Sequence, residues 1–442
     1  MAVLEVKTPY HERLAARPPA GDNGWLHRLR AEAAAHFETR GFPTRRDEDW
    51  RYTPLTALEK LAFAPAAASA AAAIRAEALD PGRFGGPDGH RLVFVDGRFA
   101  PALSAARVLP GNATAASLAA ALAADDRRIR EHLGRHAAPD ATPFVALNAA
   151  LHEDGAWIHV PRAVSLDAVV HLVFVSTVAA RPTDAHPRSL VVLEAGARAA
   201  VVEHHLALQD GAYFVNPVTE IALGARAELA HHTVVCQSDQ AFHVGYLHAD
   251  LARDCRFTAL SVTTGGALVR NHVNVELCGE DIECALHGLV VGSGAEHLDN
   301  QTRIAHRAPR GTSRQLYKAI LDERARGVFH GKVYVARGAQ QTDAKQANHA
   351  LLLARAAEMD ARPELEIYAD DVKCTHGATV GRLDRDALFY LRARGIGKVD
   401  AENLLTLAFA SDVVERIRLE EVRREVERQL YTKRPQARRI RE

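Results

Sequence analysis

The sequence predicts a mainly β protein in which a parallel β-helix fills the middle of the chain, between N-terminal and C-terminal α-helical regions. From Leu92 onward, short apolar runs are broken at regular intervals by Gly, Asp and Asn, as in LVFVDG, WIHV, VVHLVFV, SLVVLEAG and EIALGA. This is a pattern of strands without long amphipathic helices between them. Four similar segments also repeat at a nearly constant spacing, anchored at Gly196, Gly224, Ala252 and Gly279. A constant period with about three short strands per turn is typical of a β-helix, whereas a β-sandwich predicts hairpins with Asn-Gly or Asp-Gly turns.

The first region, residues 1–90, is expected to be helical. Asp22 or Asn23 can cap a helix that has an apolar residue every four positions and ends near Gly41. The apolar positions of this helix are Trp25, Leu29, Ala33 and Phe37. The polar segment RRDEDWRYTPL closes this part, and the alanine-rich stretch 64–79 predicts either a weak helix or a loose linker.

The β-helix core is expected over residues 91–383, with one face of its strands pointing inward. At the third and fifth positions after each anchor, the side chain is apolar or cysteine, and side chains alternate between the two faces of a strand. The inward positions are Ala199, Val201, Ala227, Leu229, Cys255, Phe257, Ile282 and Cys284. Cys255 and Cys284 are therefore expected to be core residues, because a buried cysteine behaves as a small hydrophobic residue.

The last region, from Asp384 to the end of the chain, returns to helical patterns. Asp384 can cap the helix ALFYLRAR before Gly395, and Asp400 can start the helix AENLLTLAFA. Ser411 is expected to open a long amphipathic helix through Leu430. The predicted C-terminal helical unit is therefore 384–442.

Composition indicates a globular protein of the cytoplasm. The chain has 442 residues, 48% of them hydrophobic and 25% charged, which is enough for two or three structural units. Basic and acidic residues are equal at 55 each, so nucleic acid is not an expected partner, and the basic tail Lys433–Arg441 is expected to be a solvated terminus. The N-terminus has no apolar stretch of signal-peptide length, and no run of about 18 apolar residues predicts a membrane span.

Cysteines and histidines are the first candidates for metal ligands. The five cysteines are an odd number without a Cys-x-x-Cys pair, which argues against a disulfide framework and against a self-contained zinc or cluster site. The 23 histidines include His204, His232 and His287, each at the eighth position after an anchor, with Leu260 interrupting the series. Stacked imidazoles on an outer strand face can bind a metal, but no carboxylate or thiolate completes this set. A surface or interface ladder without metal is therefore favoured.

Cys374 and His376 form a more specific candidate site. They follow the alternating strand LEIYADDVK and precede GATVG, and residues i and i+2 of a strand face the same side, about 6.6 Å apart. A thiol and an imidazole suit iron, zinc or copper, but an iron–sulfur cluster usually takes four protein ligands. The missing ligands must then come from sulfide, another thiol or a second chain. The alternative is that Cys374 and His376 have only structural roles.

Motifs of common enzyme classes do not occur in the sequence. Without a Gly-x-x-x-x-Gly-Lys-Ser/Thr loop the chain is not expected to bind or hydrolyse a nucleotide, and it has no Gly-x-Ser-x-Gly nucleophile elbow. A β-helix enzyme acting on a carbohydrate or acyl substrate would pair carboxylates in an aromatic-lined groove. Here aromatic residues make up 6% and the acids are scattered. The chain is therefore expected not to be an enzyme.

Two long segments and two short ones carry a resemblance to a known family. They are SRQLYKAILDERARGVFHGKVYVARGAQQTDAKQANHALLL, then ARPELEIYADDVKCTHGATVG with LFYLRARGI after it, and EDWRYTPL near the N-terminus. The stretch from Thr312 to Val380 is similar to the carboxyl-terminal core of the SufB/SufD family of iron–sulfur cluster assembly proteins. The resemblance implies a right-handed parallel β-helix flanked by helical domains, and a non-catalytic scaffold subunit.

The resemblance also implies partners and site residues. SufB and SufD subunits pair through their β-helices, each carries the SufC ATPase on its C-terminal helical domain, and the nascent iron–sulfur cluster is shared at the SufB–SufD interface. His376 is then the implied ligand, with Cys374 as a second ligand or a structural residue. SufB-like chains have an acidic residue after this histidine, where this chain has Gly377, so the SufD branch is favoured and the acidic ligand is left to the partner. The SufC contact is expected between Leu388 and Ala410, at Leu388, Leu391, Arg394, Gly395, Ile396, Leu404 and Leu405.

The alternatives are a SufB-like cluster-binding subunit in a homodimer and a β-helix enzyme acting on carbohydrate. Pairing of the isolated chain with its own copy is compatible with the scaffold hypothesis, in which the copy takes the place of SufB. The sequence does not specify the stoichiometry of the complex, the cluster type or whether a flavin associates with it.

Overall fold

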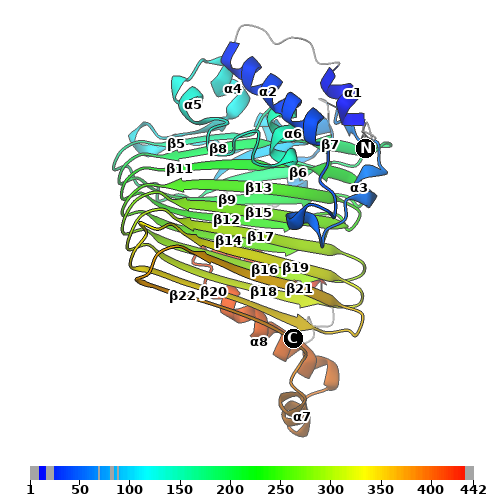
Figure 1. The fold of residues 1–442 in the computed structure, drawn as a ribbon. Helices are drawn as coiled ribbons and strands as arrows, with labels where there is room; N and C mark the ends of the chain where they lie inside the picture. Colours follow the sequence, from blue (N-terminus) through cyan, green and yellow to red (C-terminus); the bar gives the residue numbers. More distant parts are fainter. Residues whose placement is uncertain (1–8, 16–23, 68–69, 80–83, 87–88, 434–442) are drawn as a thin grey trace, which may run out of the picture.

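The computed structural model describes residues 9–15, 24–67, 70–79, 84–86 and 89–433. Within them, parallel strands wind into a β-solenoid of about eight turns between residues 157 and 381. Figure 1 shows the strands stacked along the solenoid, with helices from the first third of the chain at one end and helices α7 and α8 near the other. The predicted parallel β-helix between helical ends is therefore confirmed.

Strands that alternate along the chain belong to two different sheets, which form opposite walls of the solenoid. In the described residues, sheet A follows the spatial order β21 (Glu358–Ile367), β19 (Arg326–Val335), β17 (His297–His306), β15 (Leu268–Leu277), β13 (Phe242–Leu251), β11 (Val218–Leu223), β8 (Arg188–Leu193), β5 (Ala156–Val160) and β4 (Thr114–Ser117). Sheet B follows the order β22 (Val372–Gly381), β20 (Thr342–Leu352), β18 (Thr312–Leu321), β16 (Glu283–Gly292), β14 (Arg256–Thr264), β12 (Glu228–Cys236), β9 (Arg198–Ala207), β6 (Val170–Ser176), β2 (His90–Val95) and β3 (Arg98–Phe99). The short strands β1 (Ala64–Pro65), β7 (Thr183–Ala185) and β10 (Tyr213–Val215) also belong to sheet A, where β10 pairs with both β13 and β7, and β7 pairs with β1.

The turns β6–β7–β8 and β9–β10–β11 contain three strands, as predicted, but from β12 onward each turn contributes two long strands, because β10 and β11 both pair with the single strand β13. Strands β13 to β22 contain 9 to 11 residues each. The tight turns that enter sheet B contain a residue in the left-handed region, with φ between 58° and 73°, at equivalent places. These residues are Gly196, Arg226, Asp254, Asp281, Arg310 and Gln341. Because most of them are not glycine, glycine spacing alone does not mark every turn.

The register corrects one spacing of the predicted repeat. Arg198 pairs with Glu228, Glu228 with Arg256, and Arg256 with Glu283. The interval from Arg198 to Glu228 is longer than the predicted one from Gly196 to Gly224, so Gly196 is equivalent to Arg226 instead. The face assignment is unaffected, because a shift by an even number of positions keeps the alternation of side chains.

The inward positions form the core as predicted. All eight predicted residues, Cys255 and Cys284 among them, belong to one buried cluster in the solenoid. Burial raises the pKa of the Cys255 thiol to about 11 and that of Cys284 to about 12. Both thiols are therefore protonated at neutral pH and act as apolar core groups.

Helices and short 3₁₀ turns of the first third of the chain lie at the N-terminal end of the solenoid, except that those between Glu48 and Glu59 lie along sheet A, where Glu48 contacts Arg362 of β21. They are α1 (Pro9–Ala15), α2 (Gly24–Arg40), α3 (Thr56–Glu59), α4 (Leu118–Ala123), α5 (Arg127–His132) and α6 (Pro143–Leu151), with the 3₁₀ turns η1 (Glu48–Trp50), η2 (Ala70–Ala73), η3 (Ala76–Ala78), η5 (Pro101–Leu103) and η6 (Pro110–Asn112). Helix α2 agrees with the predicted helix, since Ala33 and Phe37 are buried and Gly41, with φ of 60°, follows its end. The expected caps Asp22 and Asn23 lie outside the described residues.

Helices α4 to α6 fall within the range assigned to the β-helix core and were not predicted. Every residue from Phe144 to Leu151 in α6 is buried, so the sequence there has no polar face and shows no helical period. Thr142 caps this helix by accepting a hydrogen bond from the Val145 amide, and Pro143 takes its first position.

The segment EDWRYTPL fastens the N-terminal region to the outer face of sheet A. Trp50 stacks on Phe144 with ring centroids 5.2 Å apart, and the Arg270 guanidinium of β15 lies 3.8 Å from the centre of the Trp50 ring. Arg270 also forms a buried ion pair with Asp299 of β17, and the Thr53 hydroxyl donates to the same carboxylate over 2.5 Å. Residues from distant parts of the sequence are thereby joined in one buried polar group.

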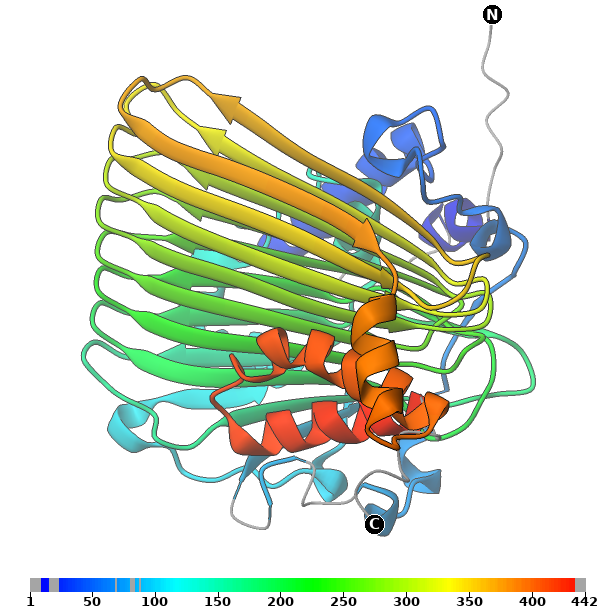
Figure 2. The same ribbon diagram turned by 90° about the horizontal axis from the view of Figure 1, so that it is seen from below.

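Three helices follow the solenoid in the described part of the chain: α7 (Arg385–Ala393), α8 (Lys398–Val414) and α9 (Glu420–Lys433). Figure 2 shows α8 and α9 lying across the strands of sheet B, where they bury an apolar face against its outer surface. Asp384 caps α7 as predicted, by accepting hydrogen bonds from two backbone amides. The predicted helix start at Ser411 is wrong, because α8 continues to Val414 and the Ser411 hydroxyl donates to the Ala408 carbonyl inside it.

None of the helices in the described part of the chain is long and apolar enough to cross a membrane. The basic tail from residue 434 lies outside the described residues.

Candidate functional site

Cys374 and His376 lie on β22, the last strand of sheet B. Cys374 is paired with Ala344 of β20, and His376 with Gln346. Because Ala344 and Gln346 are buried on the inward face of β20, the thiol and the imidazole both belong to the inward face of the final turn. The register therefore agrees with the prediction that Cys374 and His376 lie on the same face of one strand.

The final turn leaves the solenoid open. Within the described residues, β21 pairs with β19 alone and β22 with β20 alone, so each has one unpaired edge; Figure 2 shows both strands at the free end. Apolar side chains near this end are exposed, among them Ile367, Tyr368 and Val380, the last with an exposed fraction of 49%. Unpaired strand edges beside exposed apolar groups favour pairing with another chain.

Cys374 is half-buried at the rim of the open end. Its side chain packs against a small apolar cluster formed by Val333, Val335, Ala339, Ala344 and Ala369. This partial burial raises the pKa of the Cys374 thiol above its usual value. The thiol is therefore protonated at neutral pH, and it must lose a proton before it can bind a metal.

His376 is exposed and lies beside a buried amide. Gln346, its register partner, is buried, and neither its side-chain oxygen nor its side-chain nitrogen has a hydrogen-bond partner among the described residues. Gly331 makes room for this amide, since a Cβ there would lie 2.3 Å from the Gln346 nitrogen. A buried amide without a hydrogen-bond partner costs folding free energy. The open end of the solenoid therefore offers the polar groups of Gln346 to a chain that covers it.

The site is incomplete within one chain. In the part of the chain that the structure describes, no three His, Cys, Asp or Glu side chains are grouped so that they could hold a metal ion. Cys374 and His376 are therefore too few to form a complete metal site among the described residues.

The three histidines of the proposed column are not stacked. His232 and His287 share one register position with Leu260 between them, whereas His204 is level with Val234. All three side chains are buried, and the His204 Nε2 lies 3.1 Å from the Nδ1 of His171. The expectation of an outer surface ladder is wrong, because helices α8 and α9 and neighbouring segments cover this face of sheet B.

The predicted partner-binding residues lie on α7, on the turn after it and on α8. Leu388, Leu391, Ile396, Leu404 and Leu405 are half-buried, whereas Arg394 and Gly395 are exposed. Gly395 adopts a φ of 87°, which allows the tight turn between the two helices.

The most exposed apolar residues of this hairpin were not predicted. Phe389 has an exposed fraction of 73%, and Tyr390 and Val399 are also exposed. Helix α7 has no fully buried residue, and its aromatic side chains Phe389 and Tyr390 project into solvent. The signal was available in the sequence, because LFYL places four apolar residues in a row on a short helix. Gln346 was missed because nothing in its segment marks a polar inward position.

Two family descriptions match consecutive parts of the chain, one in its N-terminal region and one in its core. The description "SUF system FeS cluster assembly, SufBD core domain" matches residues 174–409, and "SufBD protein N-terminal region" matches residues 19–172. The iron–sulfur cluster assembly protein SufD of Escherichia coli is 34% identical over 415 residues, covering 91% of this chain and 94% of that protein.

Two further relatives show the same extent of similarity. An iron–sulfur cluster assembly SufBD family protein of Synechocystis is 34% identical over 387 residues, covering 85% of this chain and 84% of its own length. The chloroplastic protein ABCI7 of Arabidopsis thaliana is 29% identical over 428 residues, covering 95% and 88%. The resemblance carried by the C-terminal motifs is thereby confirmed. This chain belongs to the SufBD family and is a component of the SUF system of iron–sulfur cluster assembly.

Proposed function

We propose that this chain is a non-catalytic scaffold subunit that pairs with a SufB subunit, carries the SufC ATPase and assembles a nascent iron–sulfur cluster as its cargo. The observation that supports this most is the open end of the solenoid, where a thiol and an imidazole, Cys374 and His376, lie on a strand with one unpaired edge. A second chain would supply both the strand pairing and the ligands that are missing. The proposed place of action is the cytoplasm.

Within this proposal, His376 is the principal ligand from this chain. Its imidazole is exposed and needs no rearrangement to reach a cluster at the interface. Cys374 is either a second ligand after losing its proton or a packing residue of the rim. Gly377 offers no side chain, so an acidic ligand would come from the SufB subunit. The division into units 1–90, 91–383 and 384–442 stays a prediction.

The ligand assignment is tested with His376→Ala and, as a matched control, Thr375→Ala. Thr375 lies next to His376 on the same strand but on its outward face. We expect both variants to assemble with their partners, and only His376→Ala to lower the iron and acid-labile sulfide content of the reconstituted complex. Equal cluster content in the two variants would remove His376 from the ligand set.

The pairing surface is tested with Val380→Lys, which places a charge among the exposed apolar groups of the open end. Val108→Lys is the control, because Val108 is a fully exposed valine outside the open end. We expect Val380→Lys to weaken co-purification with SufB, since a charge without a partner is costly to bury. If Val380→Lys and Val108→Lys retain SufB equally, the open end is not the interface.

The SufC contact is proposed on α7, its turn and the first part of α8. Phe389→Asp is expected to reduce co-purification of SufC while pairing with SufB is retained, because Phe389 is exposed and belongs to α7, the helix that projects from the solenoid in Figure 1. Loss of both partners together would point to a folding defect, which thermal melting detects. A cluster held stably by the purified chain alone would instead favour the SufB-like homodimer.

A further inference from the structure

A cavity of about 860 Å³ lies on the outer face of sheet B, away from the open end. Its floor consists of small side chains at one register position of four adjacent strands: Ala200, Ala230, Thr258 and Ala285. The segment that links α8 to α9 forms its roof. The volume lies within the range of small-molecule sites, which is roughly 300–1,000 Å³.

Two buried imidazoles form one wall of this cavity. His232 is 3% exposed and His287 is 7% exposed, and the Nδ1 atom of each has no hydrogen-bond partner among the described residues. Burial holds the pKa of both imidazoles at about 4, with nearby Arg416 contributing to that of His287. Both rings are therefore neutral at neutral pH, and each carries one N–H donor.

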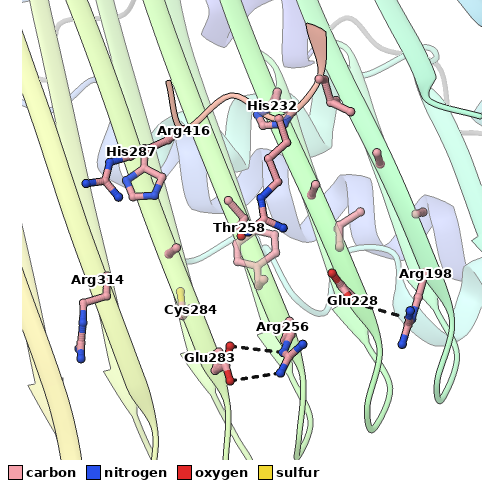
Figure 3. A pocket seen from close by; sticks show the side chains of 18 of the residues that line it. Arg198, Glu228, His232, Arg256, Thr258, Glu283, Cys284, His287, Arg314 and Arg416 are labelled. Carbon is pink, nitrogen blue, oxygen red and sulfur yellow. Dashed lines mark hydrogen bonds and ion pairs between the residues drawn. The ribbon is translucent and has the colours of Figure 1, made fainter. Parts of the chain in front are cut away.

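The charged side chains at the rim of the cavity form ion pairs with one another, whereas the arginines of the roof do not. At the rim, Arg198 pairs with Glu228 at 3.8 Å and Arg256 with Glu283 at 3.3 Å. In the roof, by contrast, no carboxylate of the described residues lies within ion-pair distance of Arg416 or Arg418, although Asp412, which pairs with Lys318, also interacts electrostatically with Arg416. The Nε of Arg416 donates to the Asp412 carbonyl, which leaves the rest of the guanidinium available. Figure 3 shows Arg416 beside His287 at the edge of the cavity.

We propose that this cavity binds a small organic phosphate. The phosphate would accept hydrogen bonds from Arg416 and from the imidazole N–H groups, because a phosphate offers only acceptors and arginine matches its geometry. A flat ring would lie on the floor, where small side chains on strands about 4.8 Å apart make a level apolar surface. The site is separate from Cys374 and His376, and it does not depend on their role in cluster assembly.

The test measures binding of AMP, inorganic phosphate and adenosine to the full chain by isothermal titration calorimetry. We expect saturable binding of AMP, and weaker binding of the two fragments. Arg416→Ala should weaken AMP binding roughly ten-fold or more, since a charge-assisted contact is lost. Ala230→Phe should abolish it by filling the floor. Arg337→Ala, which removes another exposed arginine that does not line the cavity, should leave the affinity unchanged.

Three results would overturn the proposal. The first is no saturable binding of AMP or phosphate to the wild-type chain. The second is an unchanged affinity for AMP in Arg416→Ala and Ala230→Phe. The third is adenosine binding as tightly as AMP, which would exclude a phosphate site. Thermal melting by circular dichroism identifies a variant that fails to fold, and Arg416→Ala keeps the test decisive because Arg416 lies at the protein surface.

Discussion

Acid should destabilise this protein through its buried histidines, and His306 allows the effect to be calculated. His306 is fully buried at the end of β17, where its Nε2 lies 3.0 Å from the Ser313 hydroxyl and its Nδ1 has no partner among the described residues. Burial lowers its pKa from 6.5 to about 4. The folded state therefore holds a neutral imidazole over a pH range in which the unfolded chain is already protonated.

The sign and size of the effect follow from proton linkage. Because the folded pKa lies below the unfolded one, the contribution of His306 is complete above pH 6.5 and is lost as the pH falls toward 4. Protonation favours the unfolded state by about 2 kcal/mol at pH 5 and by about 3 kcal/mol at pH 4. His171, His232 and His287 have similarly lowered pKa values of about 4. Together these groups should cause most of the acid destabilisation above pH 5, where carboxylates remain ionised.

Urea unfolding at pH 7 and pH 5, followed by circular dichroism, measures this contribution. His306→Gln keeps a polar side chain but cannot titrate, so its loss of stability between the two pH values should be smaller than that of the wild type by about 2 kcal/mol. His376→Gln is the control, because its imidazole is exposed, and it should lose as much as the wild type. Identical pH dependence of His306→Gln and the wild type would refute the reasoning.

Two further substitutions test the packing. Trp50→Ala should destabilise the protein by about 3–5 kcal/mol in urea unfolding, because a buried ring is removed from between Phe144 and a guanidinium; Trp50→Phe should cost clearly less, and equal losses would contradict this account. Gly288→Val should abolish folding into soluble protein, since a Cβ there would lie 2.2 Å from the Tyr317 ring. Gly377→Ala is the control, because no atom lies within 4 Å of the added Cβ, and it should change the stability by less than about 0.5 kcal/mol. Normal solubility and a normal melting temperature of Gly288→Val would show that the Tyr317 side chain can adopt another conformation that avoids the clash, and would contradict this account.

Local patterns in the sequence determined the class of the fold and the inward face of its strands. A strand that faces a core must alternate apolar and polar residues, and a solenoid must repeat that alternation in every turn, so both leave a period in the sequence. This is why the inward positions from Ala199 to Cys284 and the cap at Asp384 were predicted, and why Cys374 and His376 were placed on one face of one strand.

Only the tertiary structure decided which of these faces would be covered. Helices α8 and α9 fold back over sheet B, so that His232 and His287 are buried beside a cavity instead of lying on the surface. At the other end, one strand edge of β22 stays unpaired among the described residues. In that part of the chain, no further turn of the solenoid packs there against Cys374, His376 and Gln346. Burial depends on contacts between residues far apart in the chain, and neither the alternation within a strand nor the repeat between turns carries information about them. The long interval after Gly196 was missed for the same reason, because backbone pairing across the turn, not glycine spacing, sets the register.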